Sequence, residues 1–130
     1  SIIADESLYS AMDALRLVRL EAADMFHIKL AKSGGLWGAS QVVAIARAAN
    51  VPCLLGSMIE SSLGMLANYH FARAHDMVTC GLSVYGDVDD GLDVGLRIVA
   101  GNLEKEHELP GLGYPNRKAI DAAFRDSEAA

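Results

Sequence analysis

The sequence has few cysteines, no excess of basic residues and no long apolar run. Its two cysteines, Cys53 and Cys80, each lie in an apolar stretch. No secretion signal accompanies them, which favours buried free thiols, although the two could pair in principle. Neither has a Cys or His at ligand spacing, so they predict no metal site. The 11 basic residues are outnumbered by 17 acidic ones, giving a net charge of −6, which argues against nucleic acid or an anionic membrane as a partner.

Membrane and export segments are also missing. No apolar run reaches the roughly 18 residues that a membrane span needs. Residues 1–5 have neither the basic start nor the apolar stretch of a signal peptide, so we expect a cytoplasmic protein. No initiator Met is present, and either processing or truncation would account for that. Hydrophobic residues make up 52% and charged residues 22%, which predicts one globular core rather than a disordered chain.

What is present is an alternation of short apolar runs and helical patterns. The last residues of successive apolar runs are nearly evenly spaced along the sequence. This spacing is expected for βα units joined by right-handed crossovers. Ser10 followed by Asp13 predicts a capping box at the start of the first helix. The predicted strands cover 2–4, 25–31, 52–56 and 77–80, and the predicted helices cover 12–20, 40–50 and 62–73. The predicted fold class is therefore α/β.

Four βα units make only half of a (β/α)8-type barrel, which needs eight strands and about 250 residues to close. We predict that 1–100 form the C-terminal half of such a barrel. Residues 101–130 are predicted to form a separate C-terminal segment, with a helix over 117–125. A short strand is predicted at Leu96–Val99. Half a barrel would expose strand edges and an apolar inner face, so the other half is expected from a second chain, or was lost from this sequence.

The second predicted strand carries a charged side chain where a buried strand should have none. Side chains alternate between two faces along 23–31. Phe26 and Ile28 share the face suited to packing against helices, whereas His27 and Lys29 share the face that would point into a barrel. Lys29 lies near the C-terminal end of its strand, where barrels build active sites. From the pattern alone, a catalytic lysine and a lysine that reaches solvent at a strand end are equally open.

Acidic residues follow two of the other predicted strands. Asp5 ends the first strand and could ligate a hard cation such as Mg²⁺, or could be solvated or cap a helix. Glu60 follows the third strand and could contact a substrate or place a negative charge at a helix N-terminus. His70 lies on an apolar helical face and is predicted to be a packed histidine. The acidic segment 87–90 lacks calcium-loop spacing, so it predicts a solvated turn.

Four motifs together resemble the enolase superfamily. They are Ala4–Ser7, Ile28–Leu36, Gly56–Ser61 and Pro110–Gly113, and they occur in that family's order. The sequence looks most like the muconate-lactonizing subgroup, which includes muconate cycloisomerases and dipeptide epimerases. The resemblance implies a modified (β/α)7β barrel with a capping domain, against which the C-terminal segment of this chain would pack.

The resemblance also implies roles for individual residues. Asp5 matches the third carboxylate ligand of an essential Mg²⁺, for which Mn²⁺ could substitute, and Lys29 matches the acid/base lysine. Ser57, Met58 and Glu60 match a segment beside the substrate. In such a site, a lysine exchanges the proton next to a carboxylate while Mg²⁺ stabilises the developing negative charge. Asp5 and Lys29 are therefore expected to project into one shared cavity.

The function expected from this resemblance is a Mg²⁺-dependent isomerase of the muconate cycloisomerase type. It would act on a small carboxylate substrate through an enolate-like intermediate, in a homo-oligomer. A racemase, epimerase or dehydratase of the same superfamily is an alternative. So are a barrel enzyme that uses Lys29 as a Schiff-base nucleophile and a catalytically incomplete fragment with an assembly role.

The sequence also departs from the pattern of the superfamily. The family's other two metal carboxylates and its second-strand lysine pair have no counterpart in this sequence. The acidic residue of the eighth strand corresponds ambiguously to Asp87 or Asp89. His27 stands where the family often has Asn or a small residue, which could alter the pocket. These departures leave the substrate class open.

Overall fold

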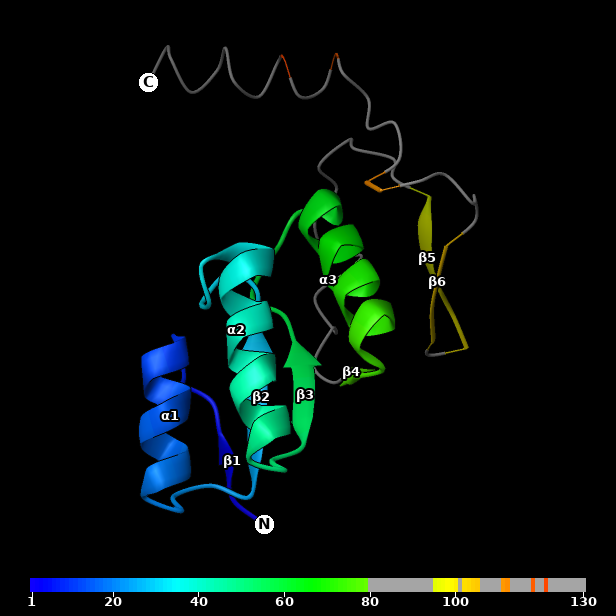
Figure 1. The fold of residues 1–130 in the computed structure, drawn as a ribbon. Coiled ribbons are helices and arrows are strands. Elements are labelled where there is room, and N and C mark those ends of the chain that lie inside the picture. Colours follow the sequence, from blue (N-terminus) through cyan, green and yellow to red (C-terminus); the bar gives the residue numbers. More distant parts are fainter. Residues whose placement is uncertain (80–94, 101, 106–110, 113–117, 119–120, 122–130) are drawn as a thin grey trace.

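The computed structural model describes residues 1–79, 95–100, 102–105, 111–112, 118 and 121 (Figure 1). Its main part is a repeat of strands and helices. In chain order these are β1 (Ile3–Ala4), α1 (Ala11–Arg19), β2 (Met25–Lys29), α2 (Gly35–Ala48), β3 (Cys53–Gly56), α3 (Ser62–His75) and β4 (Val78–Thr79). The four strands pair in sequence order and all run parallel. The predicted α/β class and its βα units are confirmed.

The helices pack against the sheet and bury its apolar face. In Figure 1, α1 and α2 lie side by side over the sheet and α3 follows beside β3. On β2, Phe26 and Ile28 are buried in the core, whereas His27 and Lys29, on the opposite face, keep a small exposed fraction. The predicted alternation along this strand is therefore correct. The strands form an open sheet in the described part of the chain, and a full barrel is not seen there.

The start of α1 is capped as its sequence predicts. The Ser10 hydroxyl accepts a hydrogen bond from the Asp13 backbone N–H at 3.2 Å and donates to the Asp13 carboxylate at 2.7 Å. The Tyr9 N–H donates to the same carboxylate at 3.2 Å. The Tyr9 N–H, the Ser10 hydroxyl and the Asp13 N–H thereby gain hydrogen-bond partners that the helix backbone cannot supply.

The start of α2 differs from the prediction. The helix begins at Gly35 and not at residue 40. Gly34 and Gly35 have φ angles of +74° and +88°, which glycine adopts without strain, so the chain turns directly from β2 into the helix. At Gly38 a Cβ atom would lie 1.8 Å from the Ser33 carbonyl oxygen. These glycines bring the helix close to the turn that follows Lys29.

A second, smaller sheet follows in the described part of the chain. β5 (Leu96–Val99) and β6 (Asn102–Lys105) form an antiparallel pair, in which Val99 faces Asn102. The strand predicted at Leu96–Val99 is confirmed, but its partner was not predicted. Leu96 is buried and packs against Met65 and Leu66 of α3. The division of the chain at residue 100 stays a prediction.

Several sequence predictions fall wholly or partly outside the described residues. Lys118 and Asp121 are helical, in agreement with the final helix, but the rest of 117–125 is not described. The acidic segment 87–90 and Cys80 also lie outside the described residues. Cys53 carries a free, partly buried thiol. Among the residues that the structure describes, no helix is both long and apolar enough to cross a membrane.

Candidate active site

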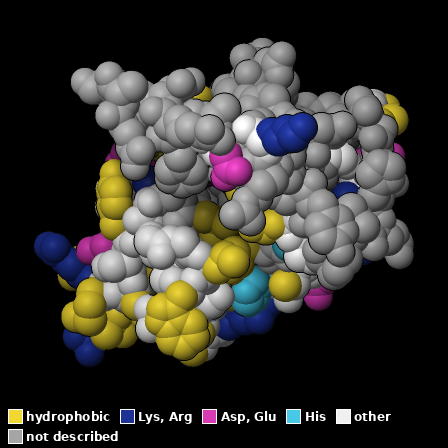
Figure 2. All heavy atoms as spheres, turned by 90° about the horizontal axis from the view of Figure 1, so that it is seen from above, with side chains coloured by type: hydrophobic (Ala, Val, Ile, Leu, Met, Phe, Trp, Pro, Cys, Tyr) yellow, Lys and Arg dark blue, Asp and Glu magenta, His cyan; other side chains and the backbone are white. Residues whose placement is uncertain are grey.

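The ends of β1 and β2 bring together the two residues that the sequence singled out. The strands are parallel neighbours, with Ala4 opposite Phe26. Asp5 directly follows β1, and Lys29 is the last residue of β2. Both side chains therefore lie at the carboxyl ends of their strands, the edge where parallel α/β folds place their active sites. Figure 2 looks onto this end of the sheet and shows histidine and basic side chains beside exposed hydrophobic ones.

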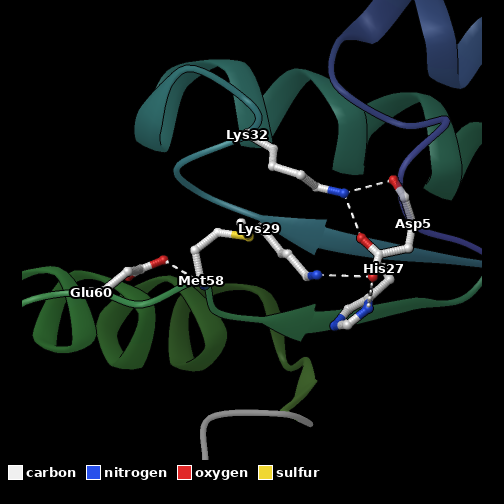
Figure 3. Close-up of polar contacts among 6 residues, drawn as sticks. All are labelled: Asp5, His27, Lys29, Lys32, Met58 and Glu60. Atoms are coloured by element: carbon white, nitrogen blue, oxygen red, sulfur yellow. Dashed lines mark hydrogen bonds and ion pairs between the residues drawn. The ribbon is translucent and has the colours of Figure 1, made fainter. Parts of the chain in front are cut away.

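The Asp5 carboxylate lies at the centre of a polar cluster (Figure 3). Its Oδ2 atom accepts a hydrogen bond from Lys29 Nζ at 2.8 Å and lies 3.1 Å from His27 Nδ1. Its Oδ1 atom accepts from Lys32 Nζ at 2.5 Å. The three partner side chains are 7–16% exposed and that of Asp5 is 25% exposed, so the cluster is largely removed from bulk water.

The charge of this cluster keeps Asp5 ionised. Burial by itself raises the pKa of the Asp5 carboxyl, but hydrogen bonds from Lys29 and Lys32 and the positive charge of Lys32 outweigh it. The net result is a pKa of about 2. At neutral pH, Asp5 therefore presents a carboxylate to its neighbours, which is the form that hard divalent cations bind.

His27 occupies its place because residue 56 is a glycine. A Cβ atom at Gly56 would lie 2.0 Å from His27 Nε2, far inside van der Waals contact. The His27 ring thus covers Gly56 on β3 while its Nδ1 atom contacts Asp5 on β1. A histidine on the middle strand connects both neighbouring strands on the face away from the helices.

The loop after β3 holds the residues expected near a substrate. In the view of Figure 3, Met58 and Glu60 lie beyond Lys29 from Asp5. Glu60 Oε1 accepts a hydrogen bond from the Met58 N–H at 3.2 Å, and Glu60 Oε2 accepts from Asn68 Nδ2 at 2.5 Å. The Met58 side chain is exposed and Ser57 is half-buried. The Glu60 carboxylate thus bonds to its own loop and to α3.

A magnesium site can be tested against these residues. An ionised carboxylate suits Mg²⁺, which prefers oxygen ligands. No group of three or more metal-binding side chains occurs among the described residues. Asp5 fits as one ligand of a site to which other residues must contribute, and these described residues do not make a complete site by themselves.

The polar cluster around Asp5 contains one neighbour that the sequence predicted and one that it did not. Asp5 and Lys29 touch, as expected, while their roles as metal ligand and acid/base stay predictions. Lys32 was not among the predicted site residues, although it contacts Asp5 as closely as Lys29 does. Its position three residues after Lys29 was the available signal, since a tight turn there returns the side chain to the strand end. His70 is half-buried, contacts Tyr69 edge-on and has its Nε2 atom 3.4 Å from Lys105 Nζ.

Comparison with known proteins agrees with this arrangement. The family model described as "Enolase C-terminal domain-like" matches residues 1–119. The chain belongs to this family. Within the enolase superfamily its relatives are those of the muconate-lactonizing subgroup, as the sequence predicted.

Two relatives illustrate the range of activities in this subgroup. The chain is 42% identical to L-Ala-D/L-Glu epimerase of Bacillus subtilis over 78 residues, which are 60% of the chain and 21% of the epimerase. It is 36% identical to muconate cycloisomerase 1 of Rhodococcus opacus over 115 residues, 86% of the chain and 31% of that enzyme. The chain thus spans less than a third of these curated relatives.

Solved structures match in the same way. The dipeptide epimerase of Cytophaga hutchinsonii, complexed with Mg and the dipeptide D-Ala-L-Val, superposes with a TM-score of 0.77 at 27% identity. This match covers 92% of the chain and 33% of the epimerase. The substrate-liganded L-Ala-D/L-Glu epimerase of Bacillus subtilis gives a TM-score of 0.76 at 34% identity, over 85% of the chain and 31% of that structure. The βα units of this chain match part of the enolase-type barrel domain.

Proposed function

We propose that this chain supplies Asp5 and Lys29 to a Mg²⁺-dependent isomerase of the muconate-lactonizing subgroup. The enzyme would remove or deliver a proton next to a carboxylate in a small substrate, by way of an enolate-like intermediate. The remaining barrel strands would come from polypeptide outside these 130 residues. The whole enzyme would work as a homo-oligomer, as expected from the sequence.

One observation carries this proposal. The Lys29 ammonium lies 2.8 Å from Asp5 Oδ2, at the ends of two neighbouring parallel strands. The lysine is 87% removed from solvent, since only 13% of its side chain is exposed. A carboxylate and an amine thus lie side by side at one edge of the sheet, and these are the two kinds of group that the proposed chemistry requires.

Each residue of the site would have a separate role in the reaction. Asp5 would hold the divalent cation, which when bound supplies Lewis-acid stabilisation of negative charge on the substrate carboxylate. Lys29 would accept or return the proton at its Nζ atom. Ser57 and Met58 would contact the substrate at the end of β3. Glu60 would support that contact by holding the Met58 N–H, since its carboxylate already accepts from this group.

An epimerase reaction is the second candidate for the same site. Several of the relatives are L-Ala-D/L-Glu or related amino-acid epimerases at 37–42% identity, whereas muconate cycloisomerase 1 of Rhodococcus opacus is 36% identical over a longer stretch. Both reactions need a lysine beside an acidic carbon. They differ in the product and not in the residues proposed here.

The experiment uses the complete protein that carries these residues, in D₂O with Mg²⁺. Proton NMR would follow a panel of L,L and L,D dipeptides, N-succinyl amino acids and cis,cis-muconate. Epimerisation exchanges the α-proton for deuterium with inversion, whereas cycloisomerisation forms a lactone. Chelation of Mg²⁺ with EDTA should abolish either reaction, and added Mg²⁺ should restore it.

Two variants test the assigned residues. Lys29→Ala should abolish turnover while Mg²⁺ affinity, measured by calorimetry, changes little. Asp5→Ala should weaken Mg²⁺ binding and turnover together. Arg19→Ala, which removes a positive charge from the exposed side of α1, is the matched control and should behave as wild type. Near-normal turnover in Lys29→Ala would refute the assignment, and borohydride trapping of a substrate on Lys29 would favour Schiff-base chemistry instead.

A further inference from the structure

The side chain of Glu60 connects the loop after β3 to α3. Its Oε1 atom accepts a hydrogen bond from the Met58 N–H at 3.2 Å (Figure 3), and its Oε2 atom accepts from Asn68 Nδ2 at 2.5 Å. A Cβ atom at Gly64 would lie 3.1 Å from the same Oε2 atom. The glycine therefore leaves room for the carboxylate to lie over the first turn of α3 and reach the second.

Asn68 is a polar residue at a position where packing alone would favour an apolar one. Its side chain is 0% exposed, and Met65 and Phe71, three residues before and after it on α3, are buried hydrophobic residues. A buried amide lowers stability unless its polar atoms are paired, and within the described part of the chain Asn68 Oδ1 has no hydrogen-bond partner. A leucine of similar volume would avoid that cost, so the bond to Glu60 is the evident reason for an amide here.

Two hydrogen bonds in series thus run from the interior of α3 to the loop after β3. We propose that Asn68 is a positioning residue: it holds the Glu60 carboxylate, which in turn holds the Met58 N–H and keeps the loop 57–60 in one conformation. This inference rests on the proposed function, because that function places Ser57 and Met58 beside the substrate.

The position of the loop determines which step of the reaction Asn68 would affect. The loop begins directly after Gly56, which pairs with Lys29 on the neighbouring strand. Met58 is 45% exposed at this edge of the sheet, so its side chain is available to a substrate but takes no part in proton transfer. Loosening the loop should therefore weaken substrate binding and leave the reacting groups in place, and changes of that kind raise KM with little effect on kcat.

The test measures steady-state kinetics of the complete protein with a substrate that the wild type turns over. Asn68→Leu keeps the volume and removes the amide. KM should rise about 10-fold, as expected for the loss of one hydrogen bond to a charged group, while kcat changes by less than about threefold. The double variant Asn68→Asp with Glu60→Gln should bring KM back toward the wild-type value. It exchanges donor and acceptor, since the new glutamine amide can donate to the new aspartate while its oxygen still accepts from the Met58 N–H.

Hydrogen exchange gives a readout that does not require turnover. In Asn68→Leu, the Met58 amide should exchange about 10-fold faster than in the wild type, because its acceptor is no longer held in place. The double variant should exchange close to the wild-type rate. Ala72→Gly is the matched control, since it weakens the same helix at a buried position four residues beyond Asn68. It should change neither KM nor the exchange of the Met58 amide.

The two readouts also separate this inference from the proposed function. An unchanged KM or an unchanged Met58 exchange rate in Asn68→Leu would overturn the inference, as would a double variant that performs no better than Asn68→Asp alone. If Asn68→Leu does not fold, Asn68→Ala replaces it, with the same expected and contrary results. If instead the wild type turns over no member of the substrate panel, the proposed function fails, and the exchange rates still decide whether Asn68 holds the loop.

Discussion

The His27 ring fills the space that a side chain at position 56 would need. A Cβ atom at Gly56 would lie 2.0 Å from Nε2 and 2.8 Å from Cε1 of His27. Gly56→Ala should therefore destabilise the protein by about 1–3 kcal/mol, the usual cost of overpacking a buried position. Urea unfolding followed by circular dichroism would measure this loss.

The double variant separates overpacking from other effects of the new methyl group. His27→Ala removes the ring that the added Cβ would meet. In that background, Gly56→Ala should be much less destabilising, which gives a coupling energy of about 1 kcal/mol or more between the two sites. Equal costs of Gly56→Ala in both backgrounds would contradict the contact.

Asn68 is the buried partner of Glu60, and its replacement should loosen the loop after β3. The Asn68 side chain is 0% exposed and its amide donates to Glu60 Oε2. Asn68→Asp would place two carboxylates against each other, so we expect a loss of about 2 kcal/mol or more in the free energy of unfolding at neutral pH. Asn68→Leu, which has a similar volume and no charge, should cost less. Thermal unfolding at pH 7 of the two variants would show the order, and the reverse order would contradict it.

His75 should make stability depend on pH. Burial and the nearby Arg47 charge lower the pKa of His75 below its usual 6.5. The unfolded chain therefore binds a proton more readily than the folded chain, and stability that is present above pH 6.5 is lost as the pH falls below it. Denaturant unfolding between pH 7.5 and 5 should show this decline. His75→Gln should reduce the slope, and an identical slope in the variant would assign it to another group.

Cys53 should react slowly with alkylating reagents in the folded protein. Burial raises the pKa of its thiol from 9.0 to about 11. Because the thiolate is the reactive form, its fraction at pH 8 falls about 100-fold. Mass spectrometry of peptides after timed iodoacetamide treatment should show slow labelling of Cys53 in buffer and fast labelling in urea. Fast labelling in buffer would show that the thiol is accessible.

The predictions that held were those that depend on local pattern. The alternation along β2 predicted that Phe26 and Ile28 face the helices while Lys29 does not. The parallel βα repeat then predicted that Asp5 and Lys29 meet at one edge of the sheet. The Ser10 cap was predictable for the same reason, since it involves atoms only three residues apart.

The features that the sequence did not predict depend on backbone conformations and side-chain contacts that the spacing of residues does not show. Two glycines in left-handed conformations let α2 begin at Gly35, whereas the helical spacing of apolar residues becomes clear only after it. The β6 strand lacks a clear alternation, so its pairing with β5 was not evident. The partner of Glu60 was also not predicted: its carboxylate bonds to Asn68, eight residues along the chain and fully buried, while the place of Glu60 beside a substrate stays a prediction.

The sequence by itself determined the order of the strands and helices, the faces of β2 and the pair of residues at its carboxyl edge, because these follow from periodicity and from the geometry of parallel strands. Only the tertiary structure decided which side chains contact each oxygen of the Asp5 carboxylate. Lys32 takes one oxygen of Asp5 and leaves the other to Lys29 and His27. That division depends on distances between side chains from separate segments, which no spacing along the chain encodes.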